Sequence, residues 1–255
     1  MFIASPASAA ATRKQYNLPN GTEFWKTDYL CVDHERIPSP NAYLIEQSPN
    51  QDVRSHFHEQ PEFQLIVGGS GLLGRNKVRP VTVHYVNAYT GYGPVCAGPE
   101  GIAYVTMRPM RDNGAQFLPE ERANMKRGPK KFFHSAPFTP RAAVDRAGMR
   151  ESITTVECAH DDGMAHWTIA CAAGQSVVAP DPALGGGQYL WLLGGEATVN
   201  GATLHANGCA FASSDEPRVT ITAGAGGAEV VVLQYPRAAY TITYQSQQYR
   251  YAAQE

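Results

Sequence analysis

The sequence contains no long apolar segment, no strong excess of charge and no paired cysteines. No run approaches the ~20 consecutive apolar residues that a membrane-spanning helix needs, so we expect no membrane span. The net charge is −2, which provides no basic face for nucleic acid or for an anionic membrane. The five cysteines lack pair spacing, and an odd number is typical of free thiols in a reducing compartment. The N-terminus lacks the basic and long apolar stretches of a signal peptide, so we expect a cytoplasmic protein.

Long helices have little room, because 24 glycines and 18 prolines interrupt the 255 residues. Only one segment, Leu118–Lys126, has a helical pattern, whereas short runs with strand propensity recur throughout. Many short strands with turn signals between them are typical of an all-β sandwich, jelly roll or barrel. The predicted strands are Ala42–Glu46, Val53–His58, Phe63–Val67, Val81–Val86, Ile102–Met107, Ser152–Glu157, Trp167–Ala170, Tyr189–Leu193, Cys209–Ala212, Val219–Thr222 and Val230–Gln234.

The two halves of the chain resemble each other at a shift of 126 residues. EFQLIVGG at Glu62–Gly69 then falls on QYLWLLGG at Gln188–Gly195. Without any gap, CAGPEG at Cys96–Gly101 falls on TAGAGG at Thr222–Gly227. A register that holds at two separate anchors predicts an internal repeat. We therefore predict two β-barrel domains, at 1–110 and 151–255, joined by a polar connector at 111–150 that carries the short helix.

His56 and His58 are the first candidate ligands for a metal ion. Alternate residues of a strand face the same side, so both imidazoles are expected on one surface. Glu62 follows Pro61, which bends the chain and lets the carboxylate return to the same interior. Two histidines and a carboxylate suit a divalent transition metal such as Fe(II), Mn, Ni, Cu or Zn. The closed cysteine and histidine sets of structural zinc sites are missing from the sequence.

The pattern HxHxxxE(x6)G, formed by His56, His58, Glu62 and Gly69, resembles the first signature motif of the cupin superfamily. Cupins are small jelly-roll (double-stranded β-helix) barrels, and proteins with two of them are called bicupins. The resemblance implies an all-β fold of two tandem cupin barrels, the first of which carries the metal site. It also favours Fe(II), because two histidines and one carboxylate form the open site of non-haem iron oxygenases.

The second cupin motif normally adds a third histidine after a proline, but Pro94-Val95-Cys96 has a cysteine at that place. Three alternatives remain at this point. His84 on the neighbouring strand supplies the missing imidazole, Cys96 binds as a thiolate, or the metal is held by the first three residues alone. Our predicted ligand set is His56, His58, Glu62 and His84.

The second half lacks these ligands, because Pro182, Leu184 and Gln188 occupy the matching positions. We expect it to be structural and to complete an interface, so that the protein forms a homodimer or a higher homo-oligomer.

Two further residues are predicted to act on a substrate. Gln64 shares the strand face of Glu62 and is placed to orient a substrate or bound oxygen, and Tyr92 is expected to line the pocket with its hydroxyl. Arg108 is expected at the rim of the barrel. Similarity to gentisate- and quercetin-type cupins implies a metal-dependent dioxygenase that acts on a small organic molecule, aromatic ones included. The alternatives are a lyase or isomerase that uses the metal as a Lewis acid, and a non-catalytic small-molecule-binding protein.

Overall fold

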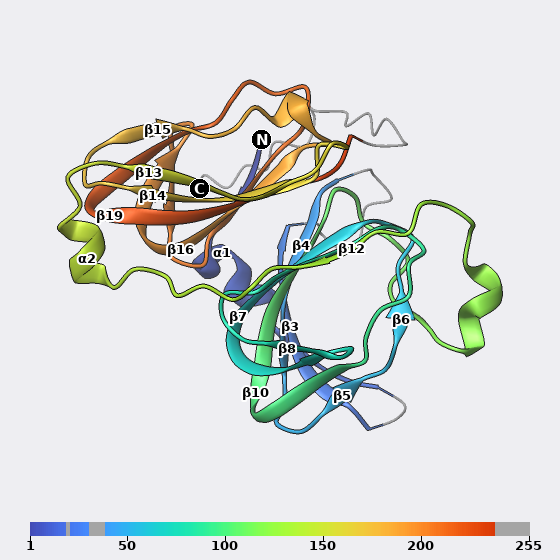
Figure 1. The fold of residues 1–255 in the computed structure, drawn as a ribbon. Helices are drawn as coiled ribbons and strands as arrows, with labels where there is room; N and C mark the ends of the chain where they lie inside the picture. Colours follow the sequence, from blue (N-terminus) through green and yellow to red (C-terminus); the bar gives the residue numbers. More distant parts are fainter. Residues whose placement is uncertain (19–20, 31–38, 238–255) are drawn as a thin grey trace. The chain divides into compact units, whose positions relative to one another are not determined.

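A computed structural model describes residues 1–18, 21–30 and 39–237 of the chain (Figure 1). The chain divides into two compact units. We call residues 10–30 and 39–139 the first unit, and residues 1–9 and 140–237 the second unit. Strands are the main regular element of both units, and the helices are few and short, as the sequence predicted. None of the helices in the described ranges is long and apolar enough to cross a membrane.

The first unit contains a nine-stranded antiparallel sheet in the order β12-β9-β7-β10-β4-β3-β2, with β5 paired to β10 and β8 paired to β7. A separate two-stranded sheet pairs β6 with β11, and a short 3₁₀ helix at Glu120–Asn124 follows β11. The strands are β2 Lys14–Asn17, β3 Glu23–Leu30, β4 Asn41–Gln47, β5 Asp52–Val53, β6 His56–Phe57, β7 Glu62–Leu73, β8 Asn76–Val78, β9 Val83–Val86, β10 Val95–Arg108, β11 Gln116–Phe117 and β12 Phe132–His134.

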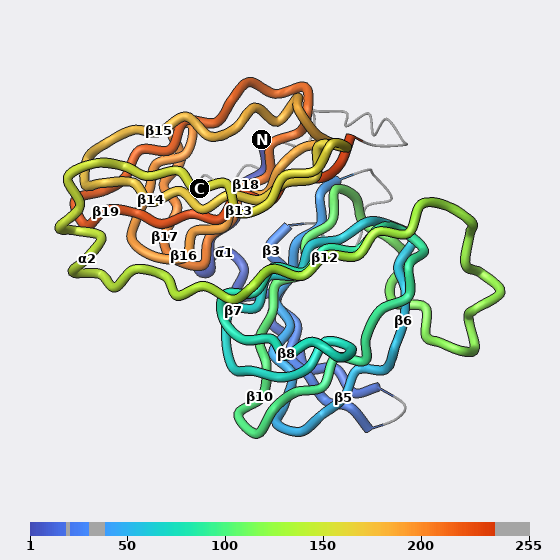
Figure 2. Tube along the Cα trace, viewed as in Figure 1, coloured from blue at the N-terminus to red at the C-terminus, as the bar shows by residue number. Residues whose placement is uncertain are grey.

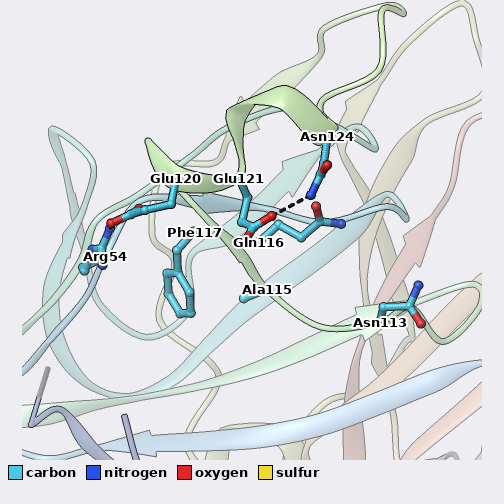
Figure 3. Close-up of a pocket in the computed structure, with 8 residues that line it drawn as sticks. All are labelled: Arg54, Asn113, Ala115, Gln116, Phe117, Glu120, Glu121 and Asn124. Atoms are coloured by element: carbon cyan, nitrogen blue, oxygen red, sulfur yellow. Dashed lines mark hydrogen bonds and ion pairs between the residues drawn. The ribbon is translucent and has the colours of Figure 1, made fainter. Parts of the chain in front are cut away.

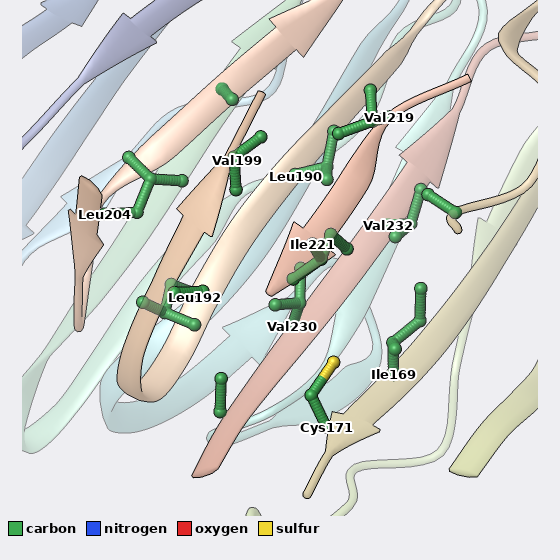
Figure 4. Close-up of a cluster of buried hydrophobic side chains, with 14 of the residues drawn as sticks. Ile169, Cys171, Leu190, Leu192, Val199, Leu204, Val219, Ile221, Val230 and Val232 are labelled. Carbon is green, nitrogen blue, oxygen red and sulfur yellow. The ribbon is translucent and has the colours of Figure 1, made fainter. Parts of the chain in front are cut away.

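The second unit contains an eight-stranded sheet in the order β1-β18-β16-β19-β14-β13, with β15 paired to β19 and β17 paired to β16. Its core consists mainly of small and branched apolar side chains, among them Leu190, Ile221 and Val232 (Figure 4). The elements are β1 Phe2–Ala4, α1 Pro6–Ala9, α2 Ala143–Ala147, β13 Ile153–Ala159, β14 Ala165–Cys171, β15 Ser176–Val178, a 3₁₀ helix at Pro182–Leu184, β16 Gln188–Val199, β17 Ala202–His205, β18 Cys209–Ala212 and β19 Thr220–Gln234. A further 3₁₀ turn at Ala10–Thr12 begins the first unit.

The strands that carry the sequence repeat are equivalent within their units. β7 and β16 both have 12 residues, start at the matched positions Glu62 and Gln188, and pair with the long strands β10 and β19. Gly69 and Gly195 both have a positive φ, of 62° and 84°. A Cβ atom at either glycine would lie 2.1 Å or 2.0 Å from a carbonyl oxygen of the partner strand. Close approach of two backbones explains why both copies keep glycine at this position.

Each predicted strand overlaps an observed one, but three details differ. Val53–His58 is broken into β5 and β6, so that His58 lies just beyond the end of a strand. The last two predicted strands are parts of the single strand β19. The predicted helix within Leu118–Lys126 is a five-residue 3₁₀ helix.

The segment predicted as a connector contributes strands to the first unit. β11 pairs with β6, and β12 pairs with β9 at the edge of the large sheet. Figure 2 shows the chain leaving β10, running outward and returning to the sheet at β12. The domain limits at 110 and 150 remain a prediction, and residues 238–255 of the predicted second domain lie outside the described residues.

Cys96, Cys158, Cys171 and Cys209 are free thiols, in agreement with the sequence. Cys31 lies outside the described residues.

Candidate metal centre

The first unit brings all the predicted site residues into its interior. Glu62 and Gln64 share one face of β7, and His84 on β9 lies opposite Gln64. Backbone hydrogen bonds in both directions join His56 to Tyr92. None of these side chains belongs to a residue that is more than 6% exposed. The set comprises His56, His58, Glu62, Gln64, His84 and Tyr92.

All three histidines of this set use their Nδ1 atom in the same way. The Nδ1 atom of His56 contacts the Arg54 carbonyl at 2.7 Å, that of His58 contacts Asp112 Oδ2 at 2.8 Å, and that of His84 contacts the Phe133 carbonyl at 3.1 Å. A carbonyl or carboxylate oxygen only accepts, so each Nδ1 carries the proton and donates it. In a neutral imidazole that donates from Nδ1, the Nε2 atom keeps its lone pair. Metal-ligating histidines are held in this same way.

The three Nε2 atoms meet different surroundings. His56 Nε2 lies 2.7 Å from the Tyr92 hydroxyl, to which Gln64 also donates from its Nε2 at 3.4 Å. His58 Nε2 lies 4.0 Å from Glu62 Oε2. His84 Nε2 is buried and has no hydrogen-bond partner. The Nε2 atoms of His56 and His58 thus face side chains that are predicted to act in catalysis or to bind the metal.

A buried ion-pair network completes the cluster. Arg108, 2% exposed, donates from Nη2 to Glu62 Oε2 at 2.6 Å, and its Nη1 lies 3.7 Å from Asp112 Oδ1. Arg108 was expected at the rim of the barrel, but it is buried because these two carboxylates neutralise its charge. Asp112 was not among the residues predicted for the site. Its only signal was an acidic residue four positions after Arg108, within a segment that looked like a solvated connector.

The environment sets the charge of these groups. Burial, and then the nearby His58, lower the pKa of His56 to about 4. Burial, and then His134, lower the pKa of His84 to about 3. Burial alone would raise the pKa of Glu62, but Arg108 and His58 hold it below its ordinary value. At neutral pH the cluster therefore presents two neutral imidazoles beside an ionised carboxylate, which is the protonation state that metal ligands require.

The pKa of Tyr92 is raised and not lowered. Burial, and then the Glu62 carboxylate, raise its pKa well above that of an ordinary tyrosine. The hydroxyl therefore keeps its proton at neutral pH and can donate it to His56 Nε2.

The side chains of the cluster fit a divalent transition metal, because histidine Nε2 atoms and a carboxylate such as that of Glu62 are ligand types that such ions select. The present arrangement is nevertheless not a ready-made coordination sphere. In the part of the chain that the structure describes, no group of three or more His, Cys, Asp or Glu side chains is placed to hold a metal ion. The Tyr92 hydroxyl is bound to His56, and the Arg108 guanidinium is bound to Glu62.

Cys96 stands apart from this cluster. Its backbone pairs with Asp52 and Leu72. Burial, and then the Asp52 side chain, raise the pKa of its thiol to about 11, which opposes the thiolate form. Tyr92, two positions before Pro94, is the residue of this segment that reaches His56.

A surface pocket of about 540 Å³ lies next to the cluster, over β11 and the following 3₁₀ helix (Figure 3). The Phe117 ring in its wall also contacts His56, with the ring centroids 5.8 Å apart. The remaining lining residues are polar apart from Ala115, and they include the ion pair between Arg54 and Glu120. The buried cluster itself does not line this pocket.

The matching positions of the second unit carry no ligand set. Pro182 and Leu184 lie in a 3₁₀ helix, and Leu184 is 58% exposed. Gln188 donates to the Pro180 carbonyl at 2.9 Å and to the Gln234 side chain at 3.0 Å, so a neutral amide pair stands where the first unit has Glu62.

No protein-family model matches the chain, and no curated protein matches it. Several solved structures do. An oxalate decarboxylase from Lactobacillus farciminis, in a formate complex, matches at a TM-score of 0.59 and 10% identity over 92% of this chain and 86% of its own. The pirin YhhW from Escherichia coli, in complex with nickel(II), matches at 0.56 and 11% identity, over 93% and 99%. A quercetin 2,3-dioxygenase from Acinetobacter baumannii matches at 0.50 and 16% identity, over 91% and 80%.

Sequence identities of 10% to 16% support a conclusion about the fold and leave the activity open. These neighbours are cupin-family proteins, and the chain has the all-β fold that they share.

Proposed function

We propose that the first unit is a cupin barrel that binds a divalent transition metal and acts on a small organic molecule, with oxygenation as the favoured reaction. One observation carries the proposal: three buried histidines each donate Nδ1–H to a protein oxygen, which leaves Nε2 as the ring atom that can bind a metal. The second unit is proposed to be a barrel of the same kind without a metal, which makes the chain a bicupin.

The proposed ligands are Nε2 of His56, Nε2 of His58 and the Glu62 carboxylate. With coordination positions left open, a bound Fe(II) ion would supply oxygen chemistry, or a Lewis acid toward a substrate oxygen. His84 is the fourth ligand predicted from the sequence. Its unpaired Nε2 is chemically suited to a metal and equally to a substrate hydroxyl.

Tyr92 and Gln64 are proposed to act on the substrate. Because the Tyr92 hydroxyl keeps its proton, it can donate a hydrogen bond to a substrate oxygen and hold that oxygen in place. Gln64 orients the hydroxyl by donating to it from Nε2. Metal binding at His56 requires Tyr92 to leave the Nε2 atom. Glu62 binds Arg108 through Oε2, which leaves its other oxygen, Oε1, for the metal.

Metal analysis of the full chain, purified without an affinity tag, tests the proposal. The protein is loaded separately with Fe(II), Mn(II), Ni(II), Cu(II) and Zn(II), and the bound metal is counted by mass spectrometry. We expect about one ion per chain and a clear loss in His56→Ala. His205→Ala serves as the control, because His205 is exposed in the second unit and pairs with Glu196. Less than roughly 0.2 ion per chain, unchanged in His56→Ala, would refute the metal site.

Oxygen uptake distinguishes the reaction classes. Catechols, gentisate, flavonols and β-diketones are supplied to the loaded protein under air, and we expect uptake with at least one of them. The second candidate is a lyase or isomerase, and the structural likeness to an oxalate decarboxylase favours testing oxalate as well. Product formation without oxygen uptake would support this second candidate. The predicted homo-oligomer is tested by light scattering on the same preparation.

A further inference from the structure

A second pair of histidines lies beside the proposed metal centre. His84 on β9 and His134 on β12 are directly opposite each other, and their rings stack at a centroid distance of 4.5 Å and an angle of 26°. The Phe132 ring lies 4.9 Å from His84 and 4.6 Å from His134. β12 is the edge strand of its sheet, and Phe132 is 47% exposed there. The pair therefore extends from the surface edge of the sheet toward the interior.

Three ring nitrogens of this pair have no hydrogen-bond partner although they are shielded from solvent. They are Nε2 of His84 and both nitrogens of His134. An unsatisfied buried polar group costs about 1–3 kcal/mol, and most such groups in native proteins are paired with protein, ordered water or a ligand. Three unsatisfied nitrogens on two stacked rings therefore indicate a place for an additional hydrogen-bonding group.

The hydrogen bonds already present define what that group must be. His84 donates from Nδ1 to the Phe133 carbonyl, so its Nε2 can only accept. A carboxylate cannot satisfy it, because a carboxylate has no proton to donate. A neutral His134 offers one donor and one acceptor. Burial lowers the pKa of His134 to about 4, which keeps it neutral at pH 7.

We infer that His84 and His134 bind the hydroxyl groups of an aromatic molecule, a catechol-type ring, at the edge formed by β9 and β12. One ring hydroxyl donates to His84 Nε2, and a neighbouring hydroxyl exchanges a hydrogen bond with His134. The exposed ring of Phe132 provides an apolar face against which the planar ligand packs. This inference rests on the proposed function and specifies its substrate class.

The position of the pair connects it to the reaction. The ring centroids of His84 and Tyr92 are 5.4 Å apart, and Tyr92 contacts His56. A hydroxylated ring held by His84 would therefore lie next to Tyr92 and the proposed metal ligands. His84 would then be a substrate-binding residue and not the fourth metal ligand.

The binding test uses the metal-free full chain, so that binding through a metal cannot be mistaken for binding to the histidines. Catechol is titrated while the imidazole proton resonances are followed by NMR. The comparison probes are 1,2-dimethoxybenzene, which cannot donate, and benzoate, which can only accept. We expect catechol to shift the resonances of His84 and His134 and to bind at least 10-fold more tightly than either comparison probe.

Two variants complete the test. His134→Phe and His84→Phe keep an aromatic ring and remove the nitrogens, and both should weaken catechol binding at least 10-fold while the metal content stays at the wild-type level. His205→Phe, at an exposed site of the second unit, is the matched control. Since His134 is only partly buried, its variant should fold even where His84→Phe does not, and thermal melting monitors both.

Three results of the binding test would overturn the inference. They are the absence of catechol binding by the wild-type protein, equal binding of 1,2-dimethoxybenzene, and unchanged catechol affinity in His134→Phe. Loss of metal in a folded His84→Phe variant would also overturn it and would restore His84 as a ligand. The proposed function fails by a different result, the absence of metal binding that depends on His56, and the two failures are therefore distinguishable.

Discussion

Asp112 provides the sharpest test of how the candidate metal centre is organised. Its side chain accepts a hydrogen bond from His58 Nδ1 at 2.8 Å through Oδ2, and one from the Gly114 amide at 3.0 Å through Oδ1. Burial alone would raise its pKa, but the hydrogen bond from His58 and the charge of Arg108 lower it to about 2. Asp112 is therefore ionised at neutral pH and holds the proton of His58 on Nδ1.

The perturbation is Asp112→Asn, which keeps the shape of the side chain and removes the charge. Asparagine has one carbonyl oxygen, so it cannot accept from both His58 and Gly114. If its NH₂ group faces His58, the imidazole must accept at Nδ1 and carry its proton on Nε2, where no metal can then bind. Loss of such a supporting hydrogen bond usually lowers metal affinity about 10- to 100-fold. That corresponds to roughly 1.4–2.8 kcal/mol of binding free energy.

The assay is a competition titration of Zn(II) or Ni(II) against a chromophoric chelator at pH 7.5. Asn113→Ala is the matched control, because Asn113 is the next residue and bonds to Glu59 outside the cluster. The melting temperature of the metal-free protein establishes that each variant is folded. A folded Asp112→Asn variant whose metal affinity lies within twofold of the wild type would refute the proposed role of Asp112.

Three other predictions concern stability. Arg108→Met leaves the buried Glu62 carboxylate unpaired, so the free energy of unfolding at pH 7 should fall by about 3–5 kcal/mol in urea titrations, and an unchanged midpoint would contradict the ion-pair assignment. His56 has a pKa of about 4 in the folded protein against 6.5 when unfolded, so the unfolded chain binds more protons between these values. The contribution of neutral His56 to the free energy of unfolding is complete above pH 6.5 and is lost as the pH falls toward 4, by up to roughly 3 kcal/mol in the metal-free protein. His56→Gln should therefore flatten the measured dependence of stability on pH. At Gly69 the backbone has a φ of 62°, and an added Cβ would lie 2.1 Å from a carbonyl oxygen, whereas a Cβ at Gly114 would meet nothing within 4 Å. Gly69→Ala should therefore lower the free energy of unfolding by at least roughly 2 kcal/mol more than Gly114→Ala does. Equal losses of stability in the two variants would count against the close approach of the strands.

The sequence was most informative where one local rule governs the structure. Alternation along β7 places Glu62 and Gln64 on one face, and the glycine at position 69 marks a close approach of two backbones. The repeat at Gln188 follows from the same two rules, so β16 starts at the matched residue. These features depend on strand geometry and backbone sterics, which a short sequence window contains.

The sequence failed where contacts join distant segments. Asp112 is 54 residues from His58, and nothing in its own neighbourhood indicates that the chain returns to cover the histidines. Arg108 looked like a rim residue, because a strand end gives no sign of the two carboxylates that allow a guanidinium to be buried. Cys96 occupies the place of the third cupin histidine in the motif, but the strand pairing of the structure brings Tyr92 to His56.

By itself, the sequence determined that this protein is built of β-strands, that its two halves share a glycine frame, and that only the first half carries the HxHxxxE side chains. The tertiary structure decided the protonation pattern and the surroundings of those side chains. It places an oxygen beside the Nδ1 atom of each candidate ligand histidine, and it places the Tyr92 hydroxyl on His56 and the Arg108 guanidinium on Glu62. It also leaves the His134 imidazole, at the edge of the sheet, without a hydrogen-bond partner. The physical reason is that hydrogen bonds and buried ion pairs depend on distances between segments remote in sequence, whereas strand patterning depends on immediate neighbours.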